Sequence, residues 1–140
     1  MRNDILKLVQ IQIVFIVLFA FFKFIRPPVL GGDYPEWVNI MLLSLPNLFE
    51  GIIGVLMLTG IGLYLNINVF NPKKQIRLRT IHITALILAG IYVITQEFKL
   101  HNLGGNNVFD KNDVIFSFVG LTIGYSIVLH VPPTGNKVKY

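Results

Sequence analysis

ILKLVQIQIVFIVLFAFFKFI, residues 5–25, is apolar over nearly its whole length and carries charge only near its two ends. About 20 apolar residues in a helix cross the hydrocarbon core of a bilayer. Lys7 and Lys23 are close enough to the ends of this stretch for their ammonium groups to reach the headgroup region. The stretch is longer than the apolar core of a signal peptide and no small residues follow it, so it predicts a retained membrane-spanning helix.

Three further apolar stretches have the same character, at about residues 46–65, 80–98 and 113–131. In the whole chain of 140 residues, 54% are hydrophobic and 14% are charged. A soluble domain carries roughly a quarter charged residues. We therefore predict an all-α integral membrane protein, in which residues 1–140 form one transmembrane domain, a four-helix bundle.

The segment between the first two spans contains several residues that interrupt helices. Pro27 and Pro28 predict the end of the first helix, with two glycines following. Pro35 is suited to the first position of a new helix. The stretch 35–44 is too short to span a bilayer and carries Trp37, so it predicts a short helix lying in the interface. Pro46 would then begin the second span.

Basic residues set the expected orientation. With the N-terminus inside, eight of the 12 Lys and Arg residues lie on the inner side and four on the outer side. The inner group is Arg2, Lys7, Lys73, Lys74, Arg77, Arg79, Lys137 and Lys139; the outer group is Lys23, Arg26, Lys99 and Lys111. Because Lys and Arg concentrate in cytoplasmic segments, this bias predicts a multi-pass inner (plasma) membrane protein with both termini cytoplasmic. It also accounts for the net charge of +5 without nucleic-acid binding.

Three acidic residues from three different spans lie near the outer ends. Glu50 lies about one turn inside the second span, Glu97 at the end of the third, and Asp113 at the start of the fourth. An acid inside a span is costly and is a functional-site hypothesis by default. With Gln96 and Ser117, these residues are the candidates for a ligand-binding or proton site. Lys23 and Arg26 are their candidate charge partners.

Small residues recur at helical spacing beside these acids. The packing candidates are Gly51 and Gly54 in the second span and Gly120 and Gly124 in the fourth. Small residues mark the faces on which helices approach closely in membranes. The polar side chains are therefore expected to point into the bundle and to line a polar pocket that opens outward.

Structural roles for the same residues stay open. Asp113 is equally suited to capping the N-terminus of a helix, and Glu50 to a structural ion pair with Lys23. His82 and His130 have no third ligand near them in the sequence, and we expect neither a metal site nor a cofactor. The chain has no cysteine, no phosphate loop and no nucleophile with a base. No catalytic residue is recognisable, which favours a protein that is not an enzyme.

The last third of the chain resembles the VanZ-like family of small bacterial membrane proteins. The residues that carry the resemblance are Glu97 at the end of one span and Asp113, Ser117, Gly120 and Gly124 in the next. Ser117 replaces the family's usual Asn, Asn107 stands where an Arg is usual, and Leu100 where a Gln is usual. The resemblance implies a role in the cell envelope and a place in the inner membrane of a bacterium. Glu50-Gly51 early in the second span is similar, more distantly, to DoxX-like proteins.

Three functions remain as hypotheses at this stage. The first is an envelope-associated binding or accessory protein, whose outer pocket holds a lipid headgroup or a segment of a membrane-protein partner. The second is a subunit of an oligomeric transporter that uses Glu50 as a proton or cation site. The third is a lipid-modifying enzyme.

Overall fold

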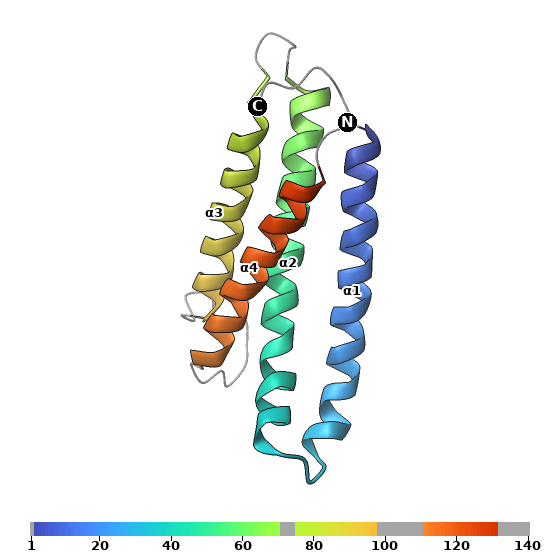
Figure 1. Cartoon of the computed structure of the whole chain (residues 1–140), viewed down its shortest axis with the longest axis vertical. Helices are drawn as coiled ribbons and strands as arrows, with labels where there is room; N and C mark the ends of the chain where they lie inside the picture. Colours follow the sequence, from blue (N-terminus) through green and yellow to red (C-terminus); the bar gives the residue numbers. More distant parts are fainter. Residues whose placement is uncertain (1, 71–74, 98–110, 132–140) are drawn as a thin grey trace.

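The computed structural model describes residues 2–70, 75–97 and 111–131, and within them it contains four α-helices and no strand (Figure 1). The helices are α1 (Arg2–Leu30), α2 (Glu36–Asn68), α3 (Leu78–Glu97) and α4 (Lys111–His130). Each is long and apolar enough to cross a membrane. The prediction of an all-α chain is confirmed, and its four helices have the length and apolarity that membrane spans require. The loop after α3, the C-terminal tail and Lys73, Lys74 and Lys99 lie outside the described residues.

The prediction of a separate interfacial helix over residues 35–44 is wrong. These residues form the first part of α2, which continues through Pro46 as one helix of 33 residues. A proline inside a helix removes one backbone donor. Ending the helix within a bilayer would leave several backbone groups without partners, which costs more. Leu42, Ser44 and Phe49 on either side of the proline are buried, so packing holds the helix together.

The predicted end of the first helix at Pro27 and Pro28 is also wrong. Both prolines lie inside α1, which continues to Leu30. The fixed φ of proline is compatible with a helix, so the cost is one lost hydrogen bond and a local clash with the preceding turn, which the last turns of a helix can absorb. The chain turns at the two glycines instead, where the Gly31 N–H donates to the Pro27 carbonyl at 3.2 Å and closes the last turn.

Helix α2 lies at the centre of the bundle and packs against each of the other three helices, most extensively against α4. Its contact with α1 is aromatic. The Phe49 ring stacks on Phe22, with 5.7 Å between centroids, and lies 6.3 Å from Phe15. Most large side chains of the membrane-spanning part of α1 are exposed on the other sides of that helix. Figure 1 shows α1 beside α2, with α3 on the opposite side of α2.

Glycines bring α2 and α4 into backbone contact. A Cβ added at Gly51 would lie 2.9 Å from the Ser117 carbonyl oxygen, and one added at Gly120 would overlap the Leu48 carbonyl. A Cβ at Gly124 would lie 3.1–3.2 Å from Val55 and Ile52. Because residue numbers rise together along this contact, α2 and α4 run parallel. The predicted packing glycines 51, 120 and 124 thus face one another, whereas Gly54 faces Ala89 of α3.

Orientation across the membrane remains a prediction, and the absence of cysteine makes it easy to test. Asp33 lies between α1 and α2 and Gln75 lies just before α3, and both are exposed. We expect Asp33→Cys to react with an impermeant maleimide added to intact cells, and Gln75→Cys to react only after the membrane is permeabilised. The reverse labelling pattern would overturn the predicted orientation.

Candidate functional site

Glu50 is half-buried on α2 and interacts electrostatically with Lys23 of α1. Successive residues of a helix differ by about 100° around its axis. Phe49 faces α1 and Gly51 faces α4, so Glu50 points between these two directions, on the side where Gly54 meets α3. Lys23 also lies over the Phe19 ring, with its Nζ 5.6 Å from the centroid. No ion pair joins Glu50 and Lys23 within the described part of the chain, and their interaction is electrostatic at longer range, so a structural pairing of the two stays a prediction.

Asp113 and Ser117 lie on the face of α4 that meets α2. Ser117 is 2% exposed, and its backbone lies against Gly51. Asp113 is half-buried one turn earlier on the same face. Ser44 of α2 is fully buried, and it lies seven residues before Gly51 just as Asp113 lies seven residues before Gly120. The seven-residue spacing therefore places Ser44 on the face of α2 that carries Gly51, and Asp113 on the face of α4 that carries Gly120.

Three oxygen atoms on these faces of α2 and α4 have no hydrogen-bond partner among the described residues: Ser44 Oγ, Asp113 Oδ1 and Ser117 Oγ. All three are buried. Two further orphan oxygens, of Asn39 and Thr59, lie elsewhere along α2. A buried oxygen without a partner costs about 1–3 kcal/mol, and buried polar groups in proteins almost always have a partner. A group from outside the chain is therefore one way to complete this site.

The other predicted site residues are placed differently. Gln96 is exposed and donates from its Nε2 to the Tyr92 hydroxyl at 2.6 Å, within α3. The side chain of Glu97 lies outside the described part of the structure, and Arg26 is half-buried on α1. Glu50 and Asp113 lie on different sides of α2. The site residues therefore divide into a pair formed by Glu50 and Lys23 and an interface group formed by Ser44, Asp113 and Ser117.

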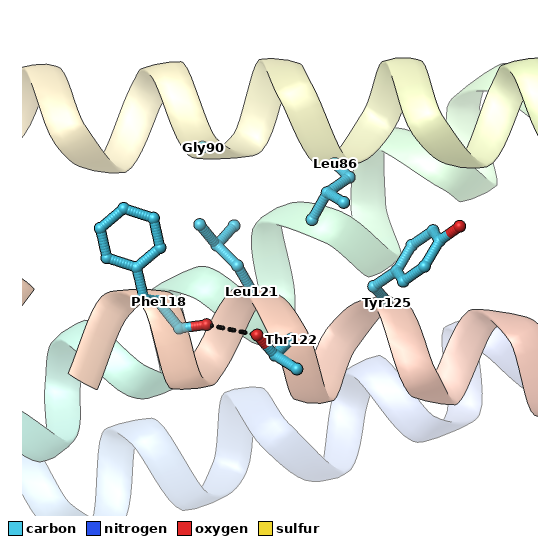
Figure 2. Close-up of a pocket in the computed structure, with 6 residues that line it drawn as sticks. All are labelled: Leu86, Gly90, Phe118, Leu121, Thr122 and Tyr125. Atoms are coloured by element: carbon cyan, nitrogen blue, oxygen red, sulfur yellow. Dashed lines mark hydrogen bonds between the residues drawn. The ribbon is translucent and has the colours of Figure 1, made fainter. Parts of the chain in front are cut away.

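A pocket of about 300 Å³ lies between α3 and α4, nearer the middle of the bundle (Figure 2). It is lined by Leu86, Gly90, Phe118, Leu121, Thr122 and Tyr125. The Thr122 hydroxyl donates to the Phe118 carbonyl of its own helix at 2.9 Å, so it has no need of a partner in the pocket. The pocket is thus apolar and separate from the predicted polar residues.

Sequence reasoning missed one polar side chain at the opposite end of the bundle. Asn66, 1% exposed near the end of α2, donates from Nδ2 to the Ile76 carbonyl at 3.0 Å and accepts from the Ile76 N–H at 2.8 Å. These two bonds fasten the connection between α2 and α3. His82 and Asp4 are also buried toward this end. No group of three side chains able to hold a metal ion occurs within the described residues.

No family model matches this chain, and no curated protein or solved structure is similar enough to match it. The resemblances to the VanZ-like and DoxX-like families therefore stay predictions. The fold itself defines the class. The chain is an all-α protein whose four apolar helices are compatible with a multi-pass membrane protein.

Proposed function

We propose that this chain is a membrane-embedded binding protein that holds a hydrogen-bond-donating lipid headgroup at the outer end of the α2–α4 interface. The observation that carries the proposal is the group of buried, unpartnered oxygens of Ser44, Asp113 and Ser117. Two hydroxyls and a carboxylate together accept hydrogen bonds from a donor such as an ammonium group. Asp113 lies in the first turn of α4, near the level where headgroups meet a membrane-spanning helix.

The transporter hypothesis has less support. A metal or organic cation at Glu50 would have to compete with the Lys23 ammonium, which interacts with the same carboxylate. A fixed positive charge nearby opposes the binding of a second one. A lipid-modifying enzyme remains third, because the arrangement contains no nucleophile aligned with a base in the described residues.

Thermal unfolding of the purified protein in detergent tests the proposal. Phosphatidylethanolamine carries an ammonium that donates hydrogen bonds, whereas the choline of phosphatidylcholine does not. We expect phosphatidylethanolamine to raise the Tm of the wild type by about 5 °C, as a few kcal/mol of ligand binding would. Phosphatidylcholine should leave it nearly unchanged. In Ser117→Ala and Asp113→Asn the difference between the two lipids should disappear.

The matched control is Thr122→Val, because the Thr122 hydroxyl is already bonded to its own helix. This variant should keep the full response to phosphatidylethanolamine. Ser117→Ala should also melt no lower than the wild type in lipid-free detergent, since it removes an orphan oxygen. An equal lipid response in the wild type and Ser117→Ala would refute the proposed site.

A further inference from the structure

We propose that the groove between α3 and α4 binds an acyl chain of an anionic phospholipid whose headgroup rests on Arg79 at the start of α3. This site is distinct from the headgroup site proposed above. It is lined by other residues, and its headgroup end, at Arg79, lies toward the opposite end of the bundle. It does not depend on the orientation of the protein, because the lipid belongs to whichever leaflet Arg79 faces.

The shape and lining of the groove suit a hydrocarbon chain. The pocket of about 300 Å³ lies between two helices that are apolar enough to span the membrane. On the α3 side the pocket is lined by Gly90, which has no side chain to fill it. A Cβ added at Gly90 would lie 3.6 Å from the Leu121 side chain of α4. Since the Thr122 hydroxyl donates its hydrogen bond within α4, it does not require a polar group in the groove.

Arg79 is on the same face of α3 as the groove. Arg79, Leu86 and Gly90 are spaced by seven and four residues, so they form one stripe along the helix. Leu86 lies about 10 Å from Arg79 along the axis, and Gly90 about 16 Å. One leaflet of the hydrocarbon core is about 15 Å thick, so a chain lying in the groove carries its headgroup to the level of Arg79.

The charge at this end selects an anionic headgroup. Arg77 and Arg79 are both exposed at the N-terminus of α3. The free N–H groups of a helix N-terminus add a partial positive charge in the same place. Figure 2 shows Tyr125 at the Leu86 end of the pocket, with its hydroxyl directed toward α3. A phosphate between Arg79 and this end of the groove is therefore placed among hydrogen-bond donors.

Native mass spectrometry of the protein released from vesicles tests the site. The vesicles contain phosphatidylglycerol and phosphatidylcholine in equal amounts, and the measured quantity is the ratio of the two lipids retained. We expect the wild type to retain phosphatidylglycerol preferentially. Arg79→Gln should lower that preference about fivefold, which is the effect of one basic residue near an anionic surface. Arg26→Gln, which removes the same charge near the other end of the bundle, should leave it unchanged.

A second pair of variants tests the groove itself. Gly90→Leu fills the hollow and should reduce the total lipid retained at this site. Gly60→Leu adds the same side chain at a glycine with open space around it and should not. Loss of the preference in Arg79→Gln with undiminished retention in Gly90→Leu would mean headgroup attraction alone and would overturn the proposal. So would a dimer in which α3 and α4 are protected from lipid, because a second copy would then fill the groove.

Discussion

Gly120→Ala is expected to lower the stability of the bundle by about 3 kcal/mol, a large effect for the addition of one methyl group. The new Cβ would overlap the carbonyl oxygen of Leu48 and lie 2.9 Å from its carbonyl carbon. These are backbone atoms of α2, so no side chain can rotate away. The helices must separate along their closest contact, which weakens the packing of Ile52 and Val55 against Gly124 as well.

Gly60→Ala is the control, because a Cβ at Gly60 would meet nothing within 4 Å. Alanine favours the helix over glycine by up to about 1 kcal/mol, so this variant should be neutral or slightly more stable. Chemical unfolding in mixed micelles measures both differences. Similar unfolding free energies for the two variants would mean that α2 and α4 do not meet through Gly120.

The number and place of the membrane-spanning helices follow from hydropathy, because a bilayer demands about 20 apolar residues and an internally satisfied backbone. The ends of the helices are less predictable from local signals. Pro27, Pro28 and Pro46 are strong helix breakers in water. In an apolar solvent each costs one hydrogen bond and a local distortion, while a broken helix would leave several backbone groups without partners, so α1 and α2 continue through them.

The pairing of helices was beyond the sequence pattern. Gly51 and Gly54 belong to one stripe of small residues, yet the first faces α4 and the second faces α3. A stripe of small residues predicts that another helix packs closely there, but it does not predict which helix. For the same reason Glu50 and Asp113, which were expected to share a pocket, lie on different sides of α2.

Side chains that bond to distant backbone groups leave little trace in the sequence. Three of the candidate polar residues, Glu50, Glu97 and Asp113, are charged, and a charge in or near an apolar helix is a strong sequence signal. Asn66 is neutral and lies near the end of an apolar helix. Asparagine is common at helix ends, so its presence there predicts no particular contact. Asn66 holds the chain in place by bonding to the backbone of Ile76, ten residues away and beyond the end of α2. The one sequence signal for it is an amide at the end of an apolar helix, just before a short connection.

Asn66→Ala should lower the stability of the protein by about 2 kcal/mol, because it removes two hydrogen bonds and leaves the backbone N–H and carbonyl of Ile76 without partners. Asn66→Asp distinguishes the contribution of the donated hydrogen bond from that of the accepted one. It keeps an acceptor for the Ile76 N–H but sets a carboxylate oxygen against the Ile76 carbonyl, so it should be at least as damaging. Both variants should also speed amide hydrogen exchange at Ile76.

Asn68→Ala is the matched control for this prediction. Asn68 is exposed, and its Nδ2 donates only to the Tyr64 carbonyl of the same helix at 3.0 Å. Without the Asn68 side chain the Tyr64 carbonyl is still part of the helix backbone. The loss of unfolding free energy should therefore stay within about 0.5 kcal/mol, as is usual for surface substitutions. If Asn66→Ala and Asn68→Ala unfold at the same denaturant concentration, Asn66 does not hold α2 to the start of α3. The connection between them must then be fixed by the packing of Leu78 and Ile81 in the core, both of which are buried.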